Sequence, residues 1–289
     1  MKINLLILFI IPIATGISAQ SDFQVIEKKM ALYSDYLVNA DRYEHRKFAN
    51  EKFTNLLEDA LGKSQSFEYP FDSLLWISKL VAPDSSFRVF SWQLTKSNAE
   101  RDYYGYLQLK SGEVFRLIDN KEDVSDLEYS AFSDEDWYGQ VYYNIIKYNK
   151  GDEAGYILFG YKLIGDHEKV KVAMPFKSEK DKLYFGKEIF KDTISGFKTL
   201  IALRTASTAA SSLNYDPDKD MIIYDHTISL MLPDMKGKLH LTDVPDGSYH
   251  GYKWNGEYWD FIDKVFDQTF EEPPVDKNHK RNVKGLFGN

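Results

Sequence analysis

The chain has 289 residues, of which 44 are Asp or Glu and 36 are Lys or Arg, so its formal net charge at pH 7 is −8. It contains no cysteine, which excludes disulfide scaffolds, thiolate metal centres and cysteine nucleophiles. The acidic charge argues against a nucleic-acid partner, because binding to phosphates requires clustered Lys and Arg. Hydrophobic residues make up 43% of the chain, enough to enclose a large core in one or two domains.

The N-terminal segment is typical of a secretory signal peptide. Lys2 precedes an apolar run over residues 5–14, and the small residues before Gln20 resemble a cleavage site. This run is about half of the roughly 20 apolar residues that a membrane-spanning helix requires. We therefore predict a signal peptide over residues 1–19 and export to the periplasm, the outer membrane or the cell exterior. The mature chain is expected to have no transmembrane helix.

Residues 22–62 have the hydrophobic periodicity of two helices. Phe23, Met30 and Leu37 recur at the seven-residue spacing of one helical face. The polar stretch at residues 39–41 predicts a break between the helices. Because two helices alone cannot enclose a core, we predict a helical hairpin that packs against the main domain.

From residue 69 to residue 268 the pattern changes to short strands separated by turn sequences, which is typical of an antiparallel β-rich domain. The fold is therefore predicted to be mainly β, as a sandwich or a barrel-like arrangement, with an N-terminal helical hairpin. A turn followed by an aromatic strand occurs at residues 83–92 and again at residues 245–254, which leaves a propeller-like arrangement as the alternative. The polar residues 271–289 predict a flexible tail.

The last predicted hairpin has the clearest turn signal. Asn255-Gly256 lies between residues 252–254 and residues 257–259. This dipeptide favours a two-residue type I′ turn, because both central positions need a positive φ. We also expect one of the two tryptophans that flank the turn, Trp254 and Trp259, to be buried against the sheet.

Several motifs of aromatic and acidic residues are spread along the chain. They are Tyr69-Pro70-Phe71-Asp72-Ser73-Leu74, Pro83-Asp84 with Phe87-Arg88 and Trp92, Trp137-Tyr138-Gly139 with Tyr142-Tyr143, Tyr215-Asp216 with Met221-Ile222 and Asp225-His226, and Asp246-Gly247-Ser248-Tyr249 with Trp254. As a set they resemble a group of exported proteins of unknown function from Bacteroidota. The resemblance covers nearly the whole mature chain; it implies export and this lineage, and it carries over no activity.

No established catalytic motif is present, so catalytic residues are unassigned. The sequence has no His-Glu-x-x-His zinc motif, no Gly-x-Ser-x-Gly nucleophile elbow and no phosphate-binding loop. His226, His240 and His250 are separated in the sequence and predict no site. Residues 119–136 carry eight acidic side chains, which is typical of a solvated loop, and the alternative is a surface that attracts a cation or a basic partner.

Asp216, Asp218 and Asp220 form a calcium candidate, because their carboxylates alternate as those of a calcium loop do. An EF-hand would need Gly and Glu where Met221 and Thr227 stand. A carboxylate-rich hairpin turn is therefore the alternative reading of this segment. Beyond this candidate, we predict no metal and no cofactor.

Trp137, Tyr138, Tyr252 and Trp254 are candidates for an exposed aromatic platform that binds sugar rings or partner side chains. The alternative is burial, because aromatic residues on strands mostly pack in cores or in cross-strand pairs. The main functional hypothesis is a non-enzymatic interaction module of the periplasm or outer membrane that binds an envelope protein. The alternative hypothesis is a carbohydrate-binding module or a polysaccharide-processing enzyme with a glycan ligand.

Overall fold

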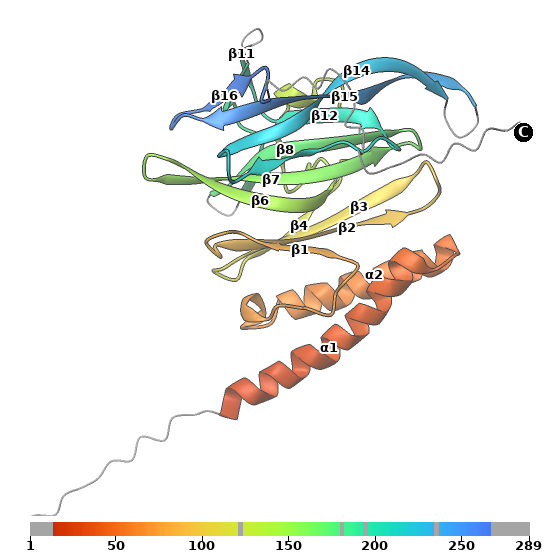
Figure 1. The fold of residues 1–289 in the computed structure, drawn as a ribbon. Coiled ribbons are helices and arrows are strands. Elements are labelled where there is room, and N and C mark those ends of the chain that lie inside the picture. Colours follow the sequence, from red (N-terminus) through yellow and green to blue (C-terminus); the bar gives the residue numbers. More distant parts are fainter. Residues whose placement is uncertain (1–13, 121–123, 180–181, 193–195, 234–236, 267–289) are drawn as a thin grey trace, which may run out of the picture.

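The structure is a computed structural model that describes residues 14–120, 124–179, 182–192, 196–233 and 237–266. Most of the predicted signal peptide (1–19) and all of the predicted tail (271–289) lie outside these residues. In the described part, the chain is mainly β, with antiparallel sheets and two N-terminal helices that form a hairpin (Figure 1), as the sequence predicts. No described helix is both long enough and apolar enough to cross a membrane.

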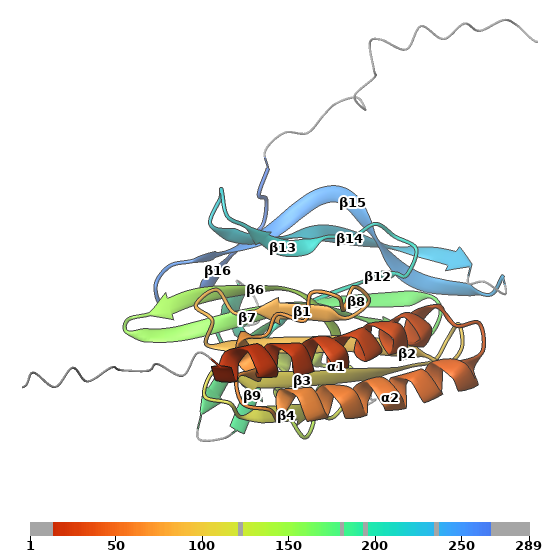
Figure 2. The same cartoon turned by 90° about the horizontal axis from the view of Figure 1, so that it is seen from below.

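The helical hairpin is the first layer of the molecule. It consists of α1 (Ala14–Asn39) and α2 (Tyr43–Leu61), and both helices lie across one face of the first sheet (Figure 2). Met30 of α1 and Phe53 of α2 are buried between the helices and this sheet. The helical periodicity of the sequence therefore predicted the buried faces correctly.

The first sheet is antiparallel and is buried on both faces. Its strands, in spatial order, are β1 (Ser78–Val81), β2 (Phe87–Thr95), β3 (Arg101–Leu109) and β4 (Val114–Leu117), and the short helix η1 (Ser66–Glu68) precedes them. Phe90 and Trp92 of β2 pack toward the helices, whereas Phe87 and Val89 pack toward the second sheet. Successive strand side chains point to opposite faces, so a strand covered on both sides is apolar almost throughout.

The second sheet lies at the centre of the stack. Its strands, in spatial order, are β5 (Phe132–Ser133), β9 (Lys182–Phe185), β8 (Glu168–Glu179), β7 (Glu153–Ile164) and β6 (Val141–Lys150), and β12 (Ile201–Ala206) also pairs with β8. Leu158 and Met174 face the core shared with the first sheet. Ile157 and Phe159 face the core shared with the third sheet.

The third sheet closes the stack. Its strands, in spatial order, are β11 (Gly196–Lys198), β10 (Phe190–Asp192), β16 (Trp259–Ile262), β15 (Leu239–Trp254), β14 (Met221–Pro233) and β13 (Leu213–Asp216); the short helix η2 (Leu127–Tyr129) lies earlier in the chain. All of its pairs are antiparallel except β10 with β16. Ile222, Tyr252 and Trp259 are among the residues it contributes to the core.

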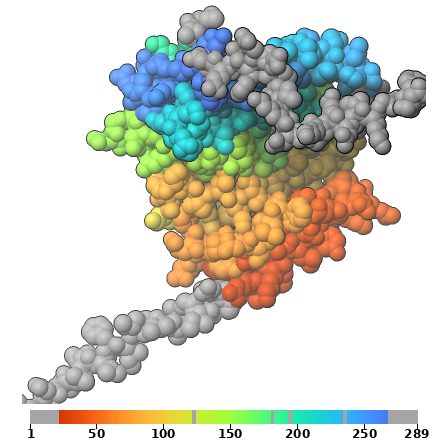
Figure 3. All heavy atoms as spheres, viewed as in Figure 1, coloured from red at the N-terminus to blue at the C-terminus, as the bar shows by residue number. Residues whose placement is uncertain are grey.

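The helices and the three sheets are therefore stacked as four layers (Figures 1 and 3). The layers follow the chain order except that β12 pairs in the second sheet after β10 and β11 have entered the third. No closed barrel is formed by the described strands, so the sandwich form of the prediction is confirmed. The propeller-like alternative is wrong. The two similar segments, residues 83–92 and 245–254, contribute to β2 and β15, which lie in the first and third sheets with the second sheet between them.

The β15–β16 hairpin has a different register from the predicted one. Trp254 pairs with Trp259, so the loop contains the four residues 255–258. The side-chain oxygen of Asn255 accepts the backbone N–H groups two and three residues later, both at 3.0 Å. This Asn turn competes with the type I′ turn. The expected burial of one tryptophan is confirmed, since Trp259 lies in the core.

Gly256 in this loop is expected to be sensitive to substitution. Its φ of +100° is unfavourable for a β-branched side chain, so Gly256→Val should destabilise the fold by about 1–3 kcal/mol. No atom lies within 4 Å of the position of a Cβ at this residue, so the loss reports backbone strain rather than a clash. Urea unfolding measures it, with Glu257→Val as the control in the same loop; equal midpoints for the two variants would contradict the prediction.

Candidate functional site

A cleft opens between the second and third sheets, where β12 faces β14 and β15. Its volume is about 560 Å³, within the range of about 300–1,000 Å³ that is typical of ligand sites. Five segments line it: residues 125–129, Lys198, residues 202–204, residues 224–227, and Asp243 with His250. These segments are far apart in the sequence, so the cleft depends on the stacking of the sheets.

Two histidines that are distant in the sequence meet in this cleft. The pairing of β14 with β15 is interrupted by a bulge next to His226, and His226 Nδ1 lies 2.7 Å from Asp246 Oδ2. The imidazole rings of His226 and His250 are 4.7 Å apart between centroids. The third candidate histidine, His240, stacks instead on His167 at 4.6 Å.

Asp246 is held as a carboxylate at this bulge. Its Oδ1 atom accepts the backbone N–H of Ser248 at 2.9 Å and the Ser248 hydroxyl at 2.7 Å. These hydrogen bonds, together with the contact to His226, lower the pKa of Asp246 to about 2. A fixed carboxylate therefore orients one imidazole of the pair.

His250 and Tyr224 present uncharged hydrogen-bonding groups. Burial, and then the neighbouring His226, lower the pKa of His250 below its usual value, although Asp263 Oδ1 lies 3.4 Å from its Nε2. At pH 7 the imidazole is neutral, with one donor and one acceptor nitrogen. Tyr224 pairs with His250 across the strands, and burial raises the pKa of its hydroxyl, which stays protonated.

Two cations of the cleft are held by acidic partners. Lys198 Nζ lies 2.9 Å from Glu128 Oε2 and 3.1 Å from Asp192 Oδ2. Although burial opposes it, the hydrogen bond to Glu128 raises the pKa of Lys198. Arg204 Nη1 lies 2.6 Å from Glu168 Oε1. These ion pairs hold the long side chains of Lys198 and Arg204 in place, so that the hydrogen-bond donors and acceptors of the cleft are ordered.

Part of the acidic segment, residues 125–129, forms one wall of the cleft. Thr199 anchors this wall, because its N–H and its hydroxyl donate to the Glu128 carbonyl oxygen at 2.7 and 3.0 Å. The same hydroxyl also lies 2.6 Å from the Ser130 carbonyl oxygen. The sequence marked this segment by its charge, but its contact with β11 and β12 appears only in the folded chain.

Three of the four aromatic candidates are not exposed. Trp137 and Tyr138 are 0% exposed and Tyr252 is 1% exposed, so the prediction of an exposed platform at these residues is wrong. Trp137 and Tyr138 lie in the core between the first and second sheets, and Tyr252 lies in the core between the second and third sheets. Trp254 is half-buried, and its Nε1–H donates to the Asn149 carbonyl oxygen at 3.1 Å.

The carboxylates of the calcium candidate take part in the hydrogen bonds of a turn. Asp216 Oδ1 accepts the N–H groups of Asp218 and Lys219 at 3.0 and 3.1 Å. Asp220 Oδ1 accepts the Tyr215 hydroxyl at 2.5 Å. Within the described ranges, no three His, Asp or Glu side chains are grouped in a way that could hold a metal ion. The geometry supports the alternative reading, a hydrogen-bonded turn between β13 and β14.

Replacing Asp218 with Asn is therefore expected to change the free energy of unfolding by no more than about 0.5 kcal/mol, because its side chain is exposed. Thermal unfolding with calcium and with a chelator measures this change. A loss that is much larger in calcium than in chelator would contradict the prediction and would restore the metal interpretation.

No family model, no curated protein and no solved structure matches this chain.

Proposed function

We propose that this chain is a non-enzymatic binding module and that its cleft takes a hydroxyl-rich ligand of the carbohydrate class. The observation that carries the proposal is the convergence of Tyr224, His226 and His250 with the ordered ion pairs of Lys198 and Arg204 in one cleft. Sugar hydroxyls both donate and accept hydrogen bonds, and neutral imidazole and phenol groups beside fixed carboxylates match that pattern. The ligand is a glycan or a glycan fragment.

A binding role fits the cleft better than catalysis. In the described part of the chain, neither His226 nor His250 is hydrogen-bonded to a serine or threonine hydroxyl, so no activated nucleophile of that kind is assembled. Glu128 is engaged by Lys198 at 2.9 Å, whereas glycoside hydrolysis needs a facing pair of carboxyl groups. The polysaccharide-processing enzyme therefore becomes the alternative, and release of reducing sugar from a bound glycan would identify it.

Calorimetric titration with soluble glycans tests the proposal. His250→Ala and Tyr224→Phe are expected to weaken binding about 3- to 10-fold each, because each removes one hydrogen-bonding group worth about 0.5–1.5 kcal/mol. His45→Ala, at an exposed position of α2, is the control and should leave binding unchanged. Absence of heat from every glycan, or equal losses in the control, would contradict the proposal.

Export places the module outside the cytoplasm and rests on the signal-peptide pattern of residues 1–19. The packing of α1 is compatible with cleavage there, because Phe23, which follows the predicted cleavage site, lies in the buried core. Phe23 stacks on Tyr69 at 4.9 Å between ring centroids. The exported protein is expected to begin at or near Gln20, and intact-mass analysis measures this; a mass that includes Met1 would contradict export by this route.

A second candidate function, binding of an envelope protein, is favoured by the distal part of the β14–β15 ribbon. Met231, Leu239 and Leu241 are 58%, 57% and 71% exposed, and they share one face because Met231 pairs with Leu241. The neighbouring strand β13 pairs with β14 only at residues 221–224, and β16 pairs with β15 only at residues 251–254. Among the described strands, the edges of the distal ribbon are therefore open. Open edges beside exposed apolar side chains suit the addition of a partner strand.

Affinity capture from envelope extracts separates this function from the first. Leu241→Ser is expected to lose a partner that both the unaltered protein and His250→Ala retain, since only the ribbon has been changed. Recovery of no stable partner, or a partner retained equally by Leu241→Ser, would contradict the ribbon as a protein-binding surface.

A further inference from the structure

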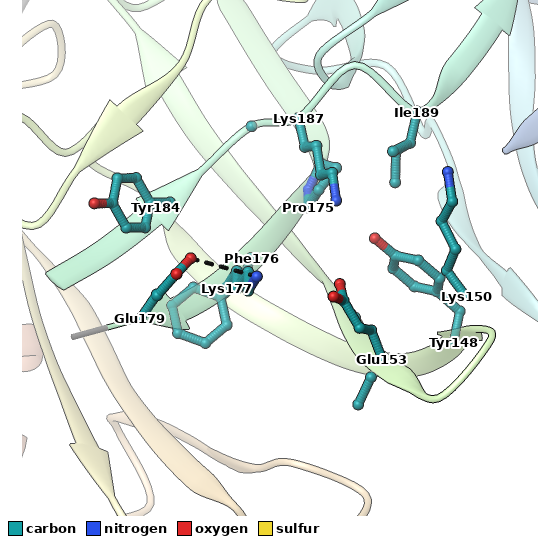
Figure 4. A pocket seen from close by; sticks show the side chains of 13 residues that line it. Tyr148, Lys150, Glu153, Pro175, Phe176, Lys177, Glu179, Tyr184, Lys187 and Ile189 are labelled. Carbon is teal, nitrogen blue, oxygen red and sulfur yellow. Dashed lines mark ion pairs between the residues drawn. The ribbon is translucent and has the colours of Figure 1, made fainter. Parts of the chain in front are cut away.

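A second concave site lies at the end of the β6–β7 hairpin, on the side of the second sheet that faces the third sheet (Figure 4). Its volume is about 290 Å³, at the lower end of the range for ligand sites. Its lining comes from β6, β7, β8 and β9 and from the segment that leads into β10. It shares no lining residue with the cleft between the second and third sheets.

The floor of this groove is apolar and closely packed. Tyr148 lies over Gly155, where a Cβ would overlap the tyrosine ring, so the ring can cover strand β7 only because position 155 is glycine. The Tyr148 ring also contacts the Trp254 and Trp259 rings, at 4.7 and 6.1 Å between centroids. Burial raises the pKa of Tyr148 to about 12, so the ring carries no charge at neutral pH. Ile189 extends the same floor.

The rim of the groove carries three lysines, Lys150, Lys177 and Lys187, against two glutamates (Figure 4). Lys177 Nζ lies 3.4 Å from Glu179 Oε2. Lys150 and Lys187 form no ion pair with any carboxylate in the described part of the chain. In a chain of net charge −8, this is a local excess of cations beside an apolar surface.

We propose that this groove binds a small amphipathic carboxylate, with its hydrocarbon part on the Tyr148 and Ile189 floor and its carboxylate at the rim of Lys150 and Lys187. Apolar burial supplies most of the attraction, and the two lysines select the charge of the ligand head. The volume suits a medium alkyl chain or a single aromatic ring. This site is independent of the glycan cleft and does not require the proposed function to hold.

The experiment uses octanoate as the probe and follows its binding by calorimetry. Tryptophan fluorescence gives a second readout, because the Trp254 ring contacts Tyr148 on the groove floor. Octanoate is expected to bind at least about tenfold more tightly than octanol and octyltrimethylammonium, with an affinity that falls as salt is added. The double variant Lys150→Glu with Lys187→Glu should weaken octanoate binding at least about tenfold. Lys63→Glu reverses the charge of an exposed lysine beyond α2, away from the groove; it is the control and should leave octanoate binding unchanged.

A further variant tests the apolar wall. Tyr184 lines the groove and is exposed, so Tyr184→Ser should fold normally and reduce the affinity gained with each added methylene of the acid. Equal affinities for octanoate and octanol, equal losses in Lys63→Glu, or no heat at millimolar octanoate would overturn the proposal. Glycan binding should be the same in the double lysine variant, so failure at one site is distinguishable from failure at the other.

Discussion

Replacing Arg88 with leucine is expected to lower the free energy of unfolding by about 3–5 kcal/mol, because it removes a buried cation that donates three hydrogen bonds. Arg88 is 4% exposed. Its Nη2–H donates to the Ser66 carbonyl oxygen at 2.6 Å, and its Nη1–H donates to the Tyr69 carbonyl oxygen at 2.7 Å. Its Nε–H donates to Gln108 Oε1 at 2.9 Å. Leucine would leave these buried acceptors without this donor.

The surroundings of Arg88 make the loss larger than that of a surface arginine. The guanidinium also lies 5.0–5.4 Å from the centroids of the rings of Phe67, Phe71 and Phe90, which attract a cation through their faces. Burial lowers the pKa of Arg88 to about 10, so it still carries its charge at neutral pH. The residue ties the segment around η1 to the first sheet.

Urea unfolding measures this effect, with Arg116→Leu as the matched control. The Arg116 side chain is 55% exposed, and its Nη1 lies 3.8 Å from Glu58 Oε1, so its loss should cost no more than about 1 kcal/mol. A loss at Arg88 as small as that at Arg116 would contradict the structural role given to the buried guanidinium.

Gly139→Ala is expected to cost about 2–4 kcal/mol, from backbone strain and from a clash in the core. The φ of Gly139 is +70°, and a Cβ there would overlap Asp119 Oδ1. Asp119 has little room to move, because its Oδ1 lies 3.4 Å from buried Lys162 Nζ. Lys162 in turn donates to the Tyr138 carbonyl oxygen at 2.7 Å.

A second glycine separates the two contributions. Gly151 has a similar φ, +60°, but no atom lies within 4 Å of a Cβ at this position, so Gly151→Ala should cost only the strain of about 1–2 kcal/mol. Thermal or urea unfolding of both variants gives the difference. Equal losses would mean that the close approach of Gly139 to Asp119 does not constrain the core.

The sequence by itself determined the helical hairpin and the mainly β class of the rest of the chain. The seven-residue spacing of Phe23, Met30 and Leu37 was enough for the first helix, and the polar stretch at residues 39–41 was enough for the break before the second. Both signals are local, since each depends on residues within one element or one turn. The predicted register of the last hairpin was wrong, because the Asn255 side chain competes for the same backbone groups as the predicted turn.

The tertiary structure alone decided which side chains are exposed and which meet. Trp137 and Tyr138 precede β6 and Tyr252 lies on β15, and the sequence does not show that a neighbouring layer buries each of them. It also separates His226 from His250, which come together only through the pairing and the bulge of β14 and β15. The physical reason is that hydrophobic periodicity reports whether a face is buried, whereas the partner of that face is set by contacts between residues far apart in the chain.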